Sequence, residues 1–149
     1  KIKIRPRFFG NENINTLEKR IGQGLDEGSR AVVVFDADVS TWNETEKERL
    51  VKLRRKYIKN KRVILCDSLP SIEYWFLLHY AMEELTKYIK DFDKTESFLK
   101  NQKWVLDMCV EGQLHMAFQR AQSFGIDGES YTNIWKAMEN IGLVKSDKY

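Results

Sequence analysis

The chain has 149 residues, of which 42% are hydrophobic and 32% are charged, and its formal net charge is +3. This length is sufficient for one core without disulfides or a structural metal, and the composition excludes a disordered chain. No apolar run approaches the roughly 20 residues that a membrane span needs. Cys66 and Cys109 have no C-x-x-C or Cys/His metal spacing. We therefore expect a cytoplasmic protein with reduced thiols, no membrane contact and a single domain over residues 1–149.

Strands and helices alternate in the first part of the chain. Lys1–Arg5 alternates basic and apolar side chains, which predicts a strand. The residues Asn15–Glu18 resemble a capping box and predict the start of a helix, which Gly22 or Gly24 can end.

The run Ala31–Asp38, with the sequence Ala-Val-Val-Val-Phe-Asp-Ala-Asp, predicts a buried strand that ends at two acids. Asp36 and Asp38 are two residues apart, so while the strand geometry lasts both side chains leave on the same side. Two such carboxylates can converge on one hard cation. The alternative is that both acids merely open a surface loop, which is common at strand ends.

A basic amphipathic helix is predicted next, with Asn43 at its start. From Glu46 to Arg62 the chain has nine basic residues and two acids, so this segment carries +7 and the remainder −4. Its expected core stripe is Leu50, Leu53, Tyr57 and Ile58. The basic side is either a solvated face or a surface that tracks nucleic-acid phosphates. The candidates for phosphate contacts are Arg5, Lys52, Arg54, Arg55, Lys56 and Lys59.

A third strand, predicted over Arg62–Cys66, completes the order β-α-β-α-β. Short connections and helical crossovers favour a parallel sheet. After Pro70 the pattern becomes helical: Ser71–Thr86 is apolar almost all round and is the expected central helix. Further helices are expected near residues 94–100, 104–124 and 131–141, where Ile134, Trp135, Met138 and Ile141 form a core stripe. The predicted fold is therefore α/β, with a sheet core in 1–70 and a helical portion in 71–149 that packs on it.

Glu73 stands in the first turn of the helix predicted after Pro70. In a parallel sheet, this strand end falls on the same edge as the two acids, provided that the strands are neighbours. The alternative is that Ser68 or Ser71 caps the helix and Glu73 only complements the helix dipole. His79 cannot share a helix face with Glu73, and we expect it to be a buried, hydrogen-bonded histidine.

Three blocks of sequence carry a resemblance to a known family. They are Ile-Lys-Ile-Arg-Pro-Arg-Phe-Phe-Gly at residues 2–10, Val-Val-Phe-Asp-Ala-Asp at 33–38, and Ser-Leu-Pro-Ser-Ile-Glu-Tyr-Trp-Phe-Leu-Leu-His at 68–79. In these blocks the chain resembles the RloB/AbiLii family of prokaryotic defence proteins. That family is Toprim-like and is grouped with the catalytic domains of topoisomerases and primases.

The resemblance implies a Toprim-like sheet and a nuclease that cleaves DNA or RNA in anti-phage defence by abortive infection. In Toprim domains the D-x-D acids hold Mg²⁺, so Asp36 and Asp38 match the ligands of Mg²⁺ or Mn²⁺. Glu73 matches a family motif and would support the metal, which makes these three residues the catalytic candidates. Nucleic acid is the implied partner. An ATPase partner protein and a homo-oligomer are further expectations.

One family motif is missing from the sequence. A Glu-Gly-x-x-Glu-like motif should precede the strand Lys1–Arg5, and no such motif is present. The family also usually has Asn and Phe at the positions of Leu69 and Ile72. Either the sequence begins inside the domain, or the polypeptide lacks a catalytic acid. In the second case it would be a non-catalytic nucleic-acid-binding or oligomerisation module that retains a metal site.

Overall fold

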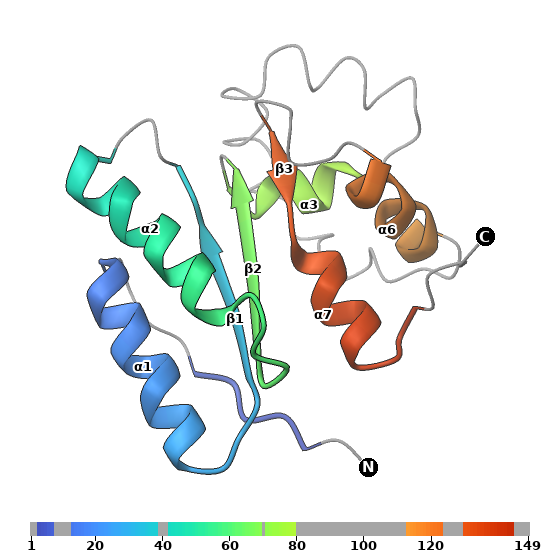
Figure 1. Cartoon of the computed structure of the whole chain (residues 1–149). Helices are drawn as coiled ribbons and strands as arrows, with labels where there is room; N and C mark the ends of the chain where they lie inside the picture. The colour runs from blue at the N-terminus through green and yellow to red at the C-terminus, as the bar shows by residue number, and fades with distance from the viewer. Residues whose placement is uncertain are drawn as a thin grey trace. The chain divides into compact units, whose positions relative to one another are not determined.

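The computed structural model describes residues 3–7, 13–38, 42–69, 71–79, 113–123 and 130–144. Within them the chain has a three-stranded sheet and helices, so the predicted mixed α/β class is confirmed (Figure 1). The chain divides into two compact units, one made of residues 1–31 and 42–63 and the other of residues 32–41 and 64–149. The helix predicted near 94–100, residues 80–86 of the one predicted over Ser71–Thr86, and Cys109 lie outside the described residues.

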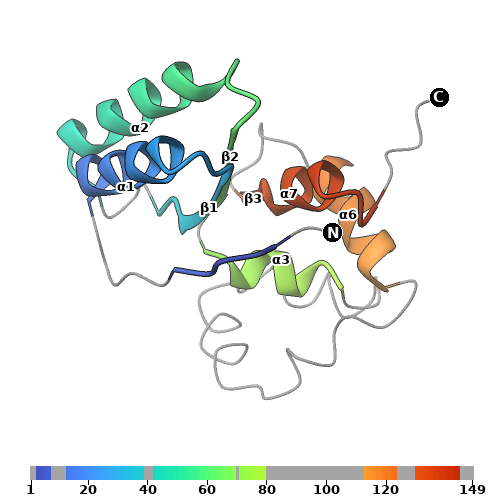
Figure 2. The same ribbon diagram turned by 90° about the horizontal axis from the view of Figure 1, so that it is seen from below.

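In the first unit, helix α1 (Ile14–Asp26) packs against helix α2 (Glu44–Tyr57), as Figure 2 shows. The cap of α1 is Asn13, whose side chain accepts a hydrogen bond from the amide of Thr16, so the cap predicted two residues later was wrong. The helix also continues through both glycines that were expected to end it. It stops before Gly28, whose φ of 77° suits a residue without a side chain.

Helix α2 begins as predicted, because Asn43 accepts a hydrogen bond from the amide of Glu46. Leu50, Leu53 and Tyr57 are buried, in agreement with the expected core stripe. Ile58 was assigned to the same stripe, but it follows the last helical residue and is 80% exposed.

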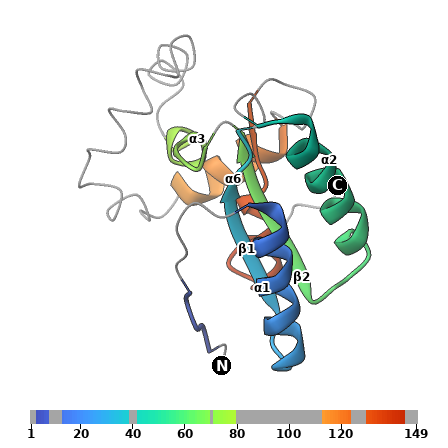
Figure 3. The same ribbon diagram turned by 90° about the vertical axis from the view of Figure 1, so that its left-hand side faces the viewer.

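The sheet contains β1 (Ala31–Asp36), β2 (Val63–Leu69) and β3 (Tyr131–Thr132), in that order. The amide of Ala31 donates to the carbonyl of Arg62, and the amide of Ala37 donates to that of Ser68. Both pairs keep the same spacing in the sequence, so β1 and β2 run parallel, as their ribbons in Figure 3 also show. The carboxyl ends of these two strands therefore lie at the same edge.

The third strand departs from the prediction. β3 runs antiparallel to β2, with Ser68 opposite Thr132 and Leu69 opposite Tyr131, so the sheet is mixed rather than parallel. A helix was expected to begin at Tyr131, but two residues join the sheet before helix α7 (Ile134–Asn140) begins. The strand expected over Lys1–Arg5 is also absent from the described part, residues 3–7, which has neither helix nor strand.

The core of the second unit joins β2 to helices α3 (Glu73–Leu77), α6 (Gln113–Ser123) and α7. Its buried members include Cys66, Trp75, Leu77, Leu78, Ala117, Ala121, Ile134 and Ala137. Trp135 and Met138 pack against this cluster, as the predicted stripe required, and Trp135 meets Phe118 edge to face. None of the described helices combines the length and the hydropathy needed to cross a bilayer.

Candidate functional site

The two acids of the D-x-D pattern stand where β1 ends. Asp36 is the last residue of the strand and is exposed, and Asp38 lies two residues further on and is partly buried. Ala37 between them is fully buried, and its amide donates to the carbonyl of Ser68 at 2.7 Å. This backbone bond fixes the acid-bearing end of β1 to the corresponding end of β2.

A hydrogen bond connects Asp36 to the segment that follows β2. Its Oδ1 accepts from the amide of Ile72 at 2.8 Å, and Ile72 is the residue at the amino end of α3. Ile72 lies between Ser71 and Glu73 in the chain. The structure thus brings Asp36 to the segment that carries Glu73.

Ser71 and Glu73 are buried, with exposed fractions of 3% and 8%. Among the residues that the structure describes, the buried hydroxyl of Ser71 and Oε2 of Glu73 have no hydrogen-bond partner. Nearly all buried polar atoms in folded proteins are paired, so each such exception needs a reason. Asp36, Asp38, Ser71 and Glu73 are called the acid site below.

The structure does not show the helix-capping role that was considered for Ser68 and Ser71. The amino end of α3 has no side-chain cap, so neither serine caps this helix. Ser68 instead shares a hydrogen bond of 2.8 Å with the hydroxyl of Thr132. The backbone carbonyl of Ser71 accepts a hydrogen bond from the amide of Tyr74.

A second group of buried polar residues joins β2 to β3 and the start of α7. The Tyr131 hydroxyl donates to Oδ2 of Asp67 at 2.8 Å, and the Asn133 amide donates to Oδ1 of Asp67 at 2.9 Å. Ser68 and Thr132 complete the group. We call these five residues the β2–β3 polar cluster. Sequence reasoning missed it, although two polar residues at the end of a strand-like run were a signal.

The oxygen-rich acid site has the donor chemistry of a Mg²⁺ or Mn²⁺ centre. Within the described ranges, no three His, Cys, Asp or Glu side chains form a group that could hold a metal. Mg²⁺ does not require such a group, because it usually keeps several waters and uses one or two carboxylates. Asp36 and Asp38 are therefore the residues that would hold a hydrated cation.

Two other side chains that could react, those of His79 and Cys66, are buried. Nδ1 of His79 lies 3.0 Å from the carbonyl of Trp75, and its ring meets the indole edge to face. Burial lowers the pKa of His79, and the prediction of a buried, hydrogen-bonded histidine is confirmed. Burial raises the pKa of the Cys66 thiol to about 12, so this residue is no nucleophile at neutral pH.

Several of the cations on α2 form ion pairs. Lys47 pairs with Glu44, Arg49 with Glu46, and Lys56 with Glu18 of α1. The Glu18 carboxylate raises the pKa of Lys56. The guanidinium of Arg62 donates to the carbonyls of Leu25 and Ser29, and thereby holds the end of α1. These four cations therefore already bind groups within the protein.

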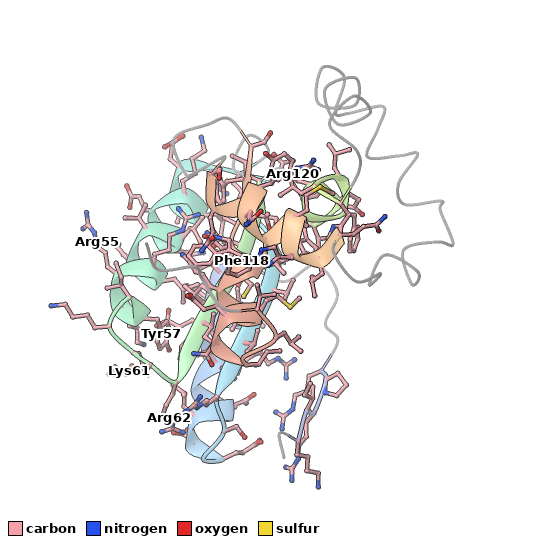
Figure 4. The ribbon with its side chains drawn as sticks, turned by 90° about the vertical axis from the view of Figure 1, so that its right-hand side faces the viewer. Arg55, Tyr57, Lys61, Arg62, Phe118 and Arg120 are labelled. Carbon is pink, nitrogen blue, oxygen red and sulfur yellow. The ribbon has the colours of Figure 1, made fainter. Side chains whose placement is uncertain are left out.

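Three of the nucleic-acid candidates form a surface of a different kind. Lys52, Arg55 and Lys59 are exposed, and in the described part of the chain they have no ion pair. Their spacing of three and four residues places them on one side of α2 and its end. Figure 4 shows Arg55 extending away from the helix. We call these three residues the basic face; of the other candidates, Arg54 is partly buried, and Arg5 lies outside α2 in the exposed segment 3–7.

A family model for RloB-like proteins matches residues 11–141, which is most of the chain. The chain belongs to the RloB-like protein family. The resemblance seen in the sequence is therefore confirmed, and the matched region of this RloB-like chain includes both the acid site and the basic face. No curated protein and no solved structure matches it.

Proposed function

We propose that this RloB-like chain acts as a nuclease that uses Mg²⁺ or Mn²⁺ to cleave the phosphodiester bonds of DNA or RNA in antiviral defence. The observation that carries the proposal is the acid site. Asp36 stands at the end of β1 and is hydrogen bonded to Ile72, the residue beside Glu73. The buried Glu73 carboxylate has one oxygen without a partner among the described residues. Family membership supports the same function.

In this proposal Asp36 and Asp38 hold the cation. The amide of Ile72 orients the Asp36 carboxylate, and Glu73 accepts hydrogen bonds from water at the site. A divalent cation at such a site would neutralise charge on the phosphoryl oxygens and activate a water.

The basic face supplies the proposed contact with nucleic acid. Cations that already have a carboxylate partner add little to polyanion binding, whereas Lys52, Arg55 and Lys59 can each neutralise a phosphate. Phosphate contacts position a protein without reading bases, so we expect binding that depends strongly on salt and weakly on sequence. The ATPase partner, the homo-oligomer, the cytoplasmic location and the single domain stay predictions.

The decisive experiment is a cleavage assay on the full chain with the substitutions Asp36→Asn and Asp38→Asn. Each should lower metal-dependent cleavage of single- or double-stranded nucleic acid by at least ~100-fold, because each removes a charge from the metal site. The circular dichroism spectrum should stay unchanged. Asp26→Asn, the same change on an exposed residue of α1, is the matched control and should retain full activity. Undiminished cleavage in both site variants would refute the proposal.

A second candidate function is a non-catalytic nucleic-acid-binding module. The observation that favours it is the basic face, which needs no metal to bind phosphates. In that case the wild-type chain binds nucleic acid but does not cleave it in Mg²⁺ or Mn²⁺. Binding would then also be unaffected by Asp36→Asn.

A further inference from the structure

We propose that the outer side of α2 is a homodimer interface, on which α2 of a second copy lies antiparallel. This inference goes beyond the proposed function and does not depend on it. It rests on the order of charged and apolar side chains along one exposed side of the helix. That order is complementary to itself when it is reversed, as a two-fold symmetric contact between identical copies requires.

One side of α2 and its end carries a continuous stripe of exposed side chains. Steps of three or four residues connect all of them, so they share a side of the helix. That side is opposite the buried Leu50, Leu53 and Tyr57, which face the protein. We call the following residues the outer stripe: Glu44, Glu48, Val51, Lys52, Arg55, Ile58 and Lys59.

The sign of the charge reverses along the outer stripe. It begins with two acids, Glu44 and Glu48, and ends with Arg55 and Lys59. When a second α2 runs in the opposite direction about the same centre, Glu44 lies opposite Lys59 of the second copy. In the same register, Glu48 lies opposite Arg55 of the second copy. Because the contact is symmetric, each of these opposite-charge pairs occurs twice.

The helix dipole explains only part of this order. It favours acids in the first turn and cations in the last turn, which accounts for Glu44 and Arg55. Glu48 lies beyond the first turn, and Lys59 follows the helix. The dipole also gives no reason for Val51, which is apolar, 44% exposed and at the centre of the stripe. In the antiparallel pair, Val51 lies close to its own counterpart, so apolar surface leaves water.

The charged side chains of the outer stripe are available to a second copy. Glu48, Arg55 and Lys59 have no ion pair among the described residues, and Figure 4 shows Arg55 extending away from the helix. Glu44 pairs with Lys47 at 2.7 Å, but its side chain is 84% exposed. A surface pair of this kind contributes little to stability, so the Glu44 carboxylate can also accept a cation of the second copy.

The association should be weak and should depend on salt. One helix from each copy makes a smaller contact than the roughly 1,600 Å² of a standard interface, so we expect a Kd of about 10–100 µM. Salt screens exposed charge pairs and should lower the affinity further. Lys52, Arg55 and Lys59 also form the basic face, so nucleic acid and the second copy would compete for them. The association is therefore to be measured without nucleic acid.

Sedimentation equilibrium of the full chain tests the proposal. Between about 1 and 300 µM protein at low salt, the average mass should rise from 17.6 kDa towards twice that value. Raising the salt to about 0.5 M should shift it back towards the monomer. Glu48→Arg and Arg55→Glu each place like charges opposite each other, and each should weaken association by at least about 10-fold. Lys19→Glu, which changes the charge of an exposed position of α1 as Arg55→Glu does, is the control and should associate like the wild type.

An equimolar mixture of Glu48→Arg and Arg55→Glu tests the register. The new arginine of one variant then lies opposite the new glutamate of the other, and the unchanged Arg55 lies opposite the unchanged Glu48. The mixture should therefore associate more tightly than either variant alone, which a folding defect would not produce. A wild-type mass that stays at 17.6 kDa over the whole range overturns the inference. So does wild-type association that both single variants retain, or a mixture no tighter than its components.

Discussion

The acid site and the β2–β3 polar cluster both lie at the carboxyl end of β2, and they differ in how completely they are hydrogen bonded. In the cluster, both Asp67 oxygens have donors and the two hydroxyls bond each other. In the acid site, the Ser71 hydroxyl and one Glu73 oxygen are buried without a partner among the described residues. A complete network stabilises a fold, whereas each buried polar atom without a partner needs a separate explanation.

The cations on α2 and at its end also divide into those with and those without a partner among the described residues. Lys47, Arg49 and Lys56 have carboxylate partners. The basic face has none among the described residues. Counting charges in the sequence treats both sets as equivalent, but only the second set is available to phosphates without first breaking an ion pair.

The largest expected effect is on the β2–β3 polar cluster. Asp67→Ala leaves the Tyr131 hydroxyl and the Asn133 amide buried without their acceptor, and should lower the free energy of unfolding by about 3 kcal/mol. Urea unfolding followed by circular dichroism measures this loss. Asp26→Ala, at an exposed position of α1, is the control and should change stability by less than about 0.5 kcal/mol. If Asp67→Ala lowers the free energy of unfolding as little as the control does, the β2–β3 polar cluster does not stabilise the fold as proposed.

The next effect concerns the basic face. The triple variant Lys52→Gln, Arg55→Gln, Lys59→Gln should weaken nucleic-acid binding by roughly 100-fold at moderate salt and lower the salt slope by about three. The matched control is Lys47→Gln, Arg49→Gln, Lys56→Gln, which removes the same formal charge from ion-paired positions. Fluorescence anisotropy at several salt concentrations measures both. Equal losses in the two triple variants would show that net charge, not the unpaired face, determines binding.

The smallest effect tests whether the hydroxyl pair acts as a unit. Thr132→Val leaves the buried Ser68 hydroxyl unpaired and should destabilise the chain by about 1–2 kcal/mol. Adding Ser68→Ala should restore part of that loss, because no buried hydroxyl is then left without a partner. A double-mutant cycle from urea unfolding measures the coupling. Strictly additive losses would mean that the two hydroxyls do not depend on each other.

Sequence alone predicted the features that depend on near neighbours in the chain. Apolar runs and caps predicted β1, the start of α2 and the mixed α/β class, because strand and helix periodicity are local properties. The prediction that β1 is buried was wrong, because Val32 and Val34 are 45% and 50% exposed. The D-x-D acids and the motif around Glu73 predicted family membership. Local signals also misled: Gly22 and Gly24 are typical helix ends, yet α1 continues through them and packs against α2.

Tertiary structure alone decided which polar side chains are paired. Asp36 finds its donor in Ile72, 36 residues away, and Ser68 finds Thr132 at a separation of 64. The neighbouring sequence does not show that, among the described residues, the Ser68 hydroxyl has a partner and the Ser71 hydroxyl has none. The antiparallel addition of β3 creates that difference, because only folding brings Thr132 opposite Ser68. The sequence therefore supplied the polar residues of the acid site, and the fold determined which of their atoms are hydrogen bonded within the described part of the chain.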